Sequence, residues 1–158
     1  MDLAYNTKDI KIWATNCTQN IVNENECRKT IRRISREVFK ASTVDFDFVK
    51  NEHKKIMTDK EKFSQFELRL KFWNYFKYGS DKLLQHMKTF NQVIDILEKR
   101  TSDPDTQKVQ NRADDKIRKY ILQLESQISQ NLHDVQRMKT TLNEYEKERH
   151  GVRLSHDS

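Results

Sequence analysis

Glycine and proline are nearly absent from this chain, which has two glycines and one proline among its 158 residues. Because these two residues supply most sharp backbone turns, their scarcity disfavours a turn-rich β fold and favours long, uninterrupted helices. A glycine-rich loop that cradles phosphate needs more glycines than the chain contains. The sequence therefore predicts an all-α protein.

Apolar residues are also few: 35% of the chain is hydrophobic and 34% is charged. This balance is polar for a compact core, so we expect an elongated shape. No apolar run is long enough to span a bilayer, and residues 1–11 contain no apolar signal core. A cytoplasmic or nuclear location is the expectation.

The two cysteines, Cys17 and Cys27, lie ten residues apart on what the pattern predicts to be one helix. That spacing corresponds to about 15 Å of helical rise, which is too far for a disulfide between them. No second Cys or His pair has zinc-site spacing. Both cysteines are therefore expected to be small buried hydrophobic residues.

The five histidines are scattered singly, and no two lie one helical turn apart as metal ligands on a helix would. They are His53, His86, His133, His150 and His156. We expect them on the surface, and the carboxylates sit beside lysines as on a solvated helix exterior. These patterns predict no metal, no cofactor, no catalytic site and no enzyme activity.

A heptad pattern organises the second half of the chain, with large side chains spaced alternately three and four apart. Its positions are Ile117, Ile121, Leu124, Ile128, Asn131, Val135, Met138, Leu142 and Tyr145. So narrow an apolar stripe needs another helix along its length, so we interpret it as a coiled-coil interface. It either pairs with another chain, giving a homo- or hetero-oligomer, or folds back on a preceding helix.

The same periodicity predicts helices over about residues 8–41, 47–78, 82–100 and 104–150, with a tail at 1–7 and a disordered tail at 151–158. The breaks fall at Ser42–Phe48, which mixes β-branched and capping residues, at Tyr78–Asp81 around Gly79, and at Thr101–Pro104. The expected architecture is an elongated coiled coil, or a helical hairpin or bundle of about four long helices. Each break is either a turn or a kink, and at Ser42–Phe48 a continuous helix is also possible.

Aromatic residues gather at the end of the second predicted helix, whose apolar stripe includes Phe66, Leu70 and Trp73. The cluster consists of Phe72, Trp73, Tyr75, Phe76 and Tyr78. At 100° per residue these side chains surround most of the helix, so several neighbours must cover them or some remain exposed as a docking patch. We favour a helix or dimer contact over a ligand site.

Positive charge is concentrated toward the N-terminus: residues 1–41 carry eight Lys and Arg against five Asp and Glu, whereas residues 101–158 carry ten of each. Five basic residues fall on one predicted helix face opposite its apolar stripe: Lys29, Arg32, Arg33, Arg36 and Lys40. This basic stripe is either an ordinary solvated face or a contact for an acidic partner.

Three functions fit these patterns. The favoured one is a structural coiled-coil protein whose stripe contacts an acidic filament such as tubulin or actin. The second is a BAR-like helical dimer on an anionic membrane, curved at the breaks around residues 42–48 and 78–81. Nucleic-acid binding ranks last, because no motif for it is present.

Part of the chain resembles the tektins, coiled-coil proteins of ciliary microtubules. The similar residues are Leu97-Glu98-Lys99-Arg100-Thr101, Pro104, Ile117, Ile121, Leu124-Glu125 and Ile128, with looser similarity around Trp13 and at Arg69-Leu70 and Trp73. The tektin loop opens with Arg-Pro and contains a cysteine, whereas Asp103-Pro104 and its followers keep only the proline. The resemblance implies an axonemal scaffold role in the cytoskeleton or cilium, and no binding residue carries over.

Overall fold

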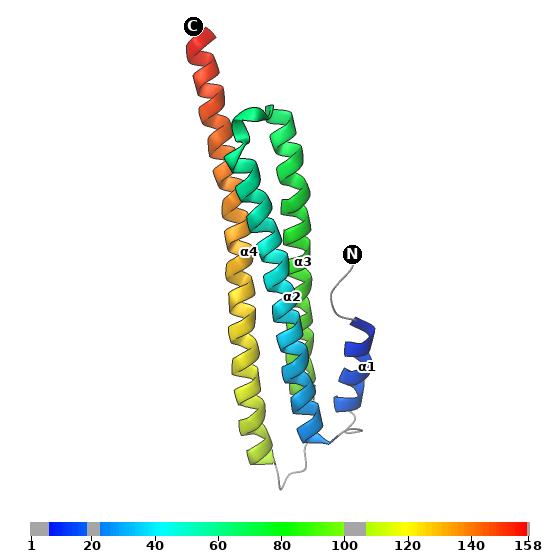
Figure 1. The fold of residues 1–158 in the computed structure, drawn as a ribbon. Helices are drawn as coiled ribbons and strands as arrows, with labels where there is room; N and C mark the ends of the chain where they lie inside the picture. The colour runs from blue at the N-terminus through cyan, green and yellow to red at the C-terminus, as the bar shows by residue number, and fades with distance from the viewer. Residues whose placement is uncertain (1–6, 19–22, 100–106, 158) are drawn as a thin grey trace.

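The computed structural model describes residues 7–18, 23–99 and 107–157, and every regular element within them is helical. Along the chain these are α1 (Thr7–Thr18), α2 (Glu24–Thr58), the short 3-10 helix η1 (Lys60–Lys62), α3 (Gln65–Lys99) and α4 (Gln107–Asp157) (Figure 1). The prediction of an all-α fold is confirmed.

Three long helices, α2, α3 and α4, lie side by side and form the body of the molecule (Figure 1). Helix α3 runs antiparallel to the other two, and α4 continues past the connection between α2 and α3. With 35 residues each, α2 and α3 are about 52 Å long at 1.5 Å per residue. The short α1 packs on α3 and α2 near the end where α2 begins, so the molecule is an elongated three-helix bundle with a short fourth helix.

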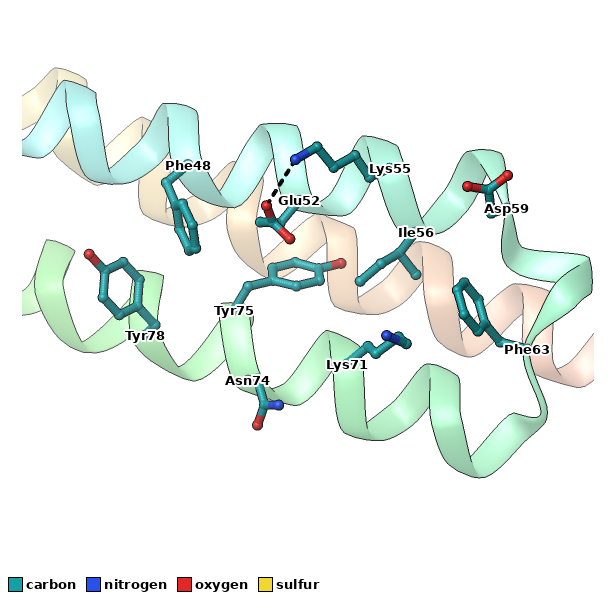
Figure 2. Close-up of a pocket in the computed structure, with 10 residues that line it drawn as sticks. All are labelled: Phe48, Glu52, Lys55, Ile56, Asp59, Phe63, Lys71, Asn74, Tyr75 and Tyr78. Atoms are coloured by element: carbon teal, nitrogen blue, oxygen red, sulfur yellow. Dashed lines mark hydrogen bonds and ion pairs between the residues drawn. The ribbon is translucent and has the colours of Figure 1, made fainter.

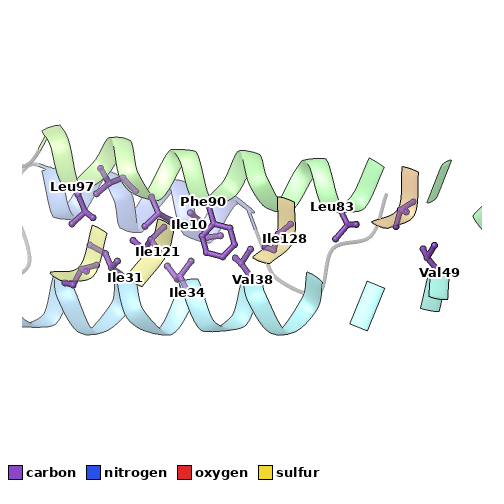
Figure 3. Close-up of a cluster of buried hydrophobic side chains, with 14 of the residues drawn as sticks. Ile10, Ile31, Ile34, Val38, Val49, Leu83, Phe90, Leu97, Ile121 and Ile128 are labelled. Atoms are coloured by element: carbon purple, nitrogen blue, oxygen red, sulfur yellow. The ribbon is translucent and has the colours of Figure 1, made fainter. Parts of the chain in front are cut away.

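The core runs along the bundle axis and receives apolar side chains from all four α-helices (Figure 3). Its largest completely buried apolar side chains are Phe90, Ile31, Leu68, Leu83, Ile117, Ile121 and Ile128. Burying one such side chain stabilises a fold by about 1.5–3 kcal/mol, so this axis holds the helices together.

Helices α2 and α3 begin at capping sequences that the periodicity did not single out. Asn23 accepts a hydrogen bond from the backbone N–H of Glu26 at 2.8 Å, and Ser64 accepts one from Glu67 at 3.2 Å. Both have a capping residue followed three positions later by Glu, the capping-box arrangement. The break after α1 and the turn after α2 therefore lie where local chemistry satisfies free N–H groups.

The predicted helix boundary at Ser42–Phe48 is wrong, and of the two alternatives left open there, a tight turn and a continuous helix, the structure shows the continuous helix, because α2 passes through this stretch without interruption. Ser42 and Thr43 donate hydrogen bonds to the carbonyl of Phe39 at 2.6 and 3.1 Å, which satisfies their hydroxyls inside the helix. The β-branched and hydroxyl residues in this stretch have low helix propensity. The free energy that this costs is smaller than the stabilisation from burying the core-facing side of α2.

The predicted turn at Tyr78–Asp81 is also wrong, because Gly79 lies in the middle of α3 and is buried. A Cβ at this position would overlap Cγ2 of Val49 on α2. The glycine is therefore present for close helix packing and not for a left-handed turn.

The expectation that the cysteines cannot pair is wrong. Cys17 and Cys27 form a disulfide, with their Cα atoms 5.7 Å apart. The distance argument assumed one continuous helix, whereas α1 ends at Thr18 and α2 begins at Glu24. The disulfide fastens α1 to the start of α2, and both cysteines are buried as expected.

The other predicted boundaries have mixed outcomes. Helix α3 ends at Lys99, close to the predicted end, and α1 begins at Thr7. Helix α4 continues to Asp157, so the predicted end at His150 and the disordered tail are wrong for residues 151–157. The remaining boundary predictions, in residues 1–6 and 100–106, fall outside the described residues.

Candidate interaction surfaces

The heptad positions of α4 face the other helices of the same chain. Ile117, Ile121, Ile128, Val135 and Leu142 are buried in the core, and Asn131 is buried among them. The remaining three, Leu124, Met138 and Tyr145, are partly buried against the same cluster. Of the two alternatives left open by the sequence, the structure shows the stripe folded against α2 and α3.

The polar residue in this stripe finds a local partner. Asn131 Oδ1 accepts a hydrogen bond from Gln127 Nε2 at 3.2 Å, one turn earlier on α4. Its buried amide therefore does not need a copy of itself from another chain.

The predicted aromatic docking patch divides between the core and the surface. Phe72 and Tyr75 are buried and Phe76 is partly buried, whereas Trp73 and Tyr78 remain exposed. Tyr75 forms a hydrogen bond with His53 Nδ1 at 2.8 Å across the α2–α3 interface. Burial lowers the pKa of His53 and, with the nearby Glu52 carboxylate, raises the pKa of Tyr75, so both groups are held neutral at pH 7.

A groove of about 450 Å³ runs between α2 and α3 on the side of this aromatic group (Figure 2). It is lined by Phe48, Glu52, Lys55, Ile56, Asp59, Phe63, Lys71, Asn74, Tyr75 and Tyr78. Glu52 pairs with Lys55 at 3.4 Å, and the ammonium of Lys71 lies 5.0 Å from the ring centre of Phe63. Its charges are already engaged locally, and it offers apolar surface without a convergent set of catalytic groups.

A buried polar cluster joins α2 to α3 below this groove. His86 is completely buried, and its Nε2 lies 2.7 Å from Asp45 Oδ2. The ammonium of Lys82 lies 3.9 Å from the same carboxylate and 4.6 Å from the ring centre of Tyr78. An Asp–His pair resembles part of a catalytic site, but a side chain with no exposed surface has no access to substrate, so the cluster fastens two helices.

The prediction of surface positions for all histidines is therefore wrong for His86, holds only in part for the partly buried His53, and holds for His133, which is exposed. His86 lies three residues after Leu83 and four before Phe90, both buried, so the core spacing could have located it. His150 and His156 lie among residues whose side chains are not described.

The basic stripe remains on the surface. All five predicted side chains, on the outer face of α2, are exposed, and within the described part of the chain none lies within 4 Å of a carboxylate. Because α2 is continuous, the stripe also extends to Lys50 and Lys54, which the predicted break had separated from it. From Lys29 to Lys54 the basic face is about 38 Å long.

A second exposed surface lies on α3, and its composition is apolar. Phe66, Leu70, Trp73 and Leu84 are 76%, 53%, 51% and 50% exposed. The assignment of the first three to the core stripe is wrong, since the core face of α3 instead carries Leu68, Phe72, Tyr75, Gly79 and Leu83. Helix α3 therefore has a buried apolar face and a second, uncovered one.

Comparison with known proteins adds no assignment: no family model, no curated protein and no solved structure matches the chain. Across residues 7–18, 23–99 and 107–157, no group of three or more His, Cys, Asp or Glu side chains is placed to hold a metal ion. None of the helices in those ranges combines the length and apolarity needed to cross a membrane.

Proposed function

We propose that this protein is a non-enzymatic helical scaffold that binds an acidic partner surface through the outer face of α2. The observation that supports the proposal is the basic face itself: seven exposed Lys and Arg side chains on one side of one helix, Lys29, Arg32, Arg33, Arg36, Lys40, Lys50 and Lys54. Asp47 is the acidic residue on this basic face, and Glu37 lies beside the face. Like charges in one row on a helix repel each other, and water and salt only screen this repulsion. Binding to an acidic surface replaces the repulsion with attraction, so the basic face favours an acidic partner.

The bundle gives this face a fixed shape. Ile31, Ile34 and Val38, on the opposite side of α2, are buried in the core, so the basic side chains all point outward from a straight support. A rigid row of charge about 38 Å long suits a regular acidic surface better than a small anion.

An acidic filament such as a microtubule is the partner class we favour. The curved-membrane alternative took its bend from breaks at 42–48 and 78–81, and both stretches lie inside continuous helices. The tektin-like resemblance points toward a microtubule scaffold as well. Nucleic acid ranks below both, since the sequence contains no recognised nucleic-acid-binding motif and offers only one row of basic side chains.

Charge reversal tests the proposal. In co-sedimentation with microtubules, actin filaments and anionic liposomes, we expect the native protein to bind microtubules, and Arg32→Glu/Arg33→Glu/Arg36→Glu to weaken binding at least tenfold. The matched control, Lys116→Glu/Lys119→Glu/Lys147→Glu, makes the same change in net charge with three exposed lysines of α4 and should bind nearly as well as the native chain.

Two further results constrain the outcome. Affinity should fall as salt rises from about 50 to 300 mM, because the Debye length shortens from about 14 to 6 Å. Reduction of the Cys17–Cys27 disulfide should leave binding unchanged, because the bundle core and not α1 supports the basic face. An equal loss of binding in both triple variants, or no binding by the native protein at low salt, would contradict the proposal. Stronger binding to liposomes than to microtubules would identify an anionic membrane as the partner.

A further inference from the structure

The Cys17–Cys27 disulfide is buried under the helix that it fastens. Cys17 and Cys27 are 2% and 1% exposed, and they join α1 to the first turn of α2. A reductant breaks a disulfide only when its thiolate reaches one of the two sulfur atoms. With so little of either cysteine exposed, α1 must move away from the bundle before a thiolate can attack.

Helix α1 has one apolar anchor besides its cysteine among the side chains that the structure describes. Ile10 is 5% exposed and belongs to the core (Figure 3), whereas Ile12, on the opposite face of α1, is 63% exposed. Ile10 also lines a groove of about 430 Å³ between α1 and α3, together with Ile96, which is 6% exposed. The packing of Ile10 therefore opposes the release of α1.

The disulfide and this packing protect each other. While Ile10 is packed, α1 keeps thiolates away from the two sulfur atoms. While the disulfide is intact, α1 stays close to α3 and packs again after each local opening, because the cross-link keeps its effective concentration high. A helix of 12 residues is marginal in water by itself, so the loss of the cross-link favours the open state.

We propose that α1 is a thiol-operated cover over the Lys99 end of α3, closed when Cys17 and Cys27 are joined and released when a dithiol reduces them. One thiolate of the dithiol attacks a cysteine sulfur and forms a mixed disulfide, and the other cysteine leaves as a thiolate. The second thiol of the reductant then attacks the mixed disulfide. The protein gains two electrons and two protons, the dithiol becomes a cyclic disulfide, and Ile96 becomes exposed.

The rate of reduction tests whether α1 protects the disulfide. Dithiothreitol in fixed excess serves as the dithiol, and samples taken over time are alkylated in denaturant and weighed by mass spectrometry. We expect the folded chain to be reduced about a hundredfold more slowly than the chain unfolded in guanidinium chloride, because the reaction waits for local opening.

Two isoleucines on opposite faces of α1 give matched variants. Ile10→Ala removes buried packing and should speed reduction of the folded chain about tenfold, since truncating a buried isoleucine favours the open state. Ile12→Ala makes the same chemical change at an exposed position and should be reduced at the native rate. Circular dichroism verifies that the bundle is folded in both variants.

The reactivity of the reduced cysteines tests whether reduction opens the cover. In the reduced and otherwise folded chain, we expect iodoacetamide to alkylate Cys17 and Cys27 within about tenfold of the rate in the unfolded chain, because an open α1 leaves both thiols accessible. Equal reduction rates in the folded and unfolded chains, equal rates in the Ile10 and Ile12 variants, or reduced cysteines that stay unreactive would each overturn the proposal. The basic face of α2 takes no part in these measurements, so their outcome is independent of partner binding.

Discussion

At the scale of single residues, the close contacts between α2 and α3 show how much depends on side-chain volume and charge. Gly79 allows the two helices to approach at Val49, and the completely buried His86 lies 2.7 Å from the Asp45 carboxylate. Both contacts join α3 to α2 in the part of α3 that follows its cluster of aromatic residues. Small changes here should alter stability by amounts that can be measured.

The substitution Gly79→Ala should change sign with its neighbour. In the native chain the added Cβ overlaps a β-branched side chain that has few alternative rotamers, so we expect a loss of about 1–2 kcal/mol in the free energy of unfolding. In a Val49→Ala background the space is open, and Gly79→Ala should instead stabilise by up to about 1 kcal/mol through its helix propensity. Denaturant unfolding of the four proteins gives the cycle, and equal effects in both backgrounds would contradict the assigned contact.

The neutral state of His53 predicts a pH dependence. Burial lowers the pKa of His53 in the folded protein, so between that lowered pKa and about 6.5 the unfolded chain binds more protons. Its contribution to stability is therefore complete above about pH 7 and decreases as the pH falls through this window. Because the ring is partly exposed, we expect only a few tenths of a kcal/mol.

His53→Asn tests this dependence. The asparagine carbonyl can accept the hydrogen bond of the Tyr75 hydroxyl but does not titrate, so thermal unfolding should depend less steeply on pH between 7.5 and 5 than in the native chain. His133→Asn, at an exposed position, is the control. Parallel pH profiles for the native and His53→Asn proteins would show that His53 does not contribute.

At the scale of elements, the helices differ in what holds them. Helices α2, α3 and α4 pack against one another over most of their length, whereas the 12-residue α1 packs on one end of the bundle and is tied by the disulfide. A helix of this length is marginal in water by itself. The stability of α1 therefore depends on its packing against the bundle and on the disulfide.

Reducing the disulfide should release α1 selectively. We expect amides in Thr7–Thr18 to lose protection from hydrogen exchange, while core amides around Ile31, Val49 and Phe90 retain theirs. Closing a loop of this size contributes about 2–3 kcal/mol in the chain-entropy estimate. Cys17→Ser/Cys27→Ser should reproduce the reduced state, and α1 amides that stay protected in both would show that packing alone secures α1.

At the scale of the whole molecule, the bundle presents two unlike surfaces on neighbouring helices. The outer face of α2 is basic, and α3 exposes the apolar side chains of Phe66, Leu70, Trp73 and Leu84. Charge on one face and apolar residues on another are suited to two different contacts, the first weakened by salt and the second largely insensitive to it.

The sequence by itself determined the helical class, the buried stripe of α4 and the exposed basic residues of α2. These follow from composition and from periodicity within one helix, where a residue's neighbours are known from its number. The capping sequences at Asn23 and Ser64 were also readable, since their hydrogen bonds are local.

Only the tertiary structure decided what Gly79, the two cysteines and His86 do in the fold. Gly79 is explained by Val49, Cys17 by Cys27, and His86 by Asp45, and each partner lies on another helix. It also decided which apolar face of α3 is covered, because α3 carries two faces with helical spacing and periodicity cannot choose between them. Packing against the neighbouring helices buries Leu68, Phe72 and Leu83, whereas Phe66, Leu70 and Trp73 remain exposed to solvent.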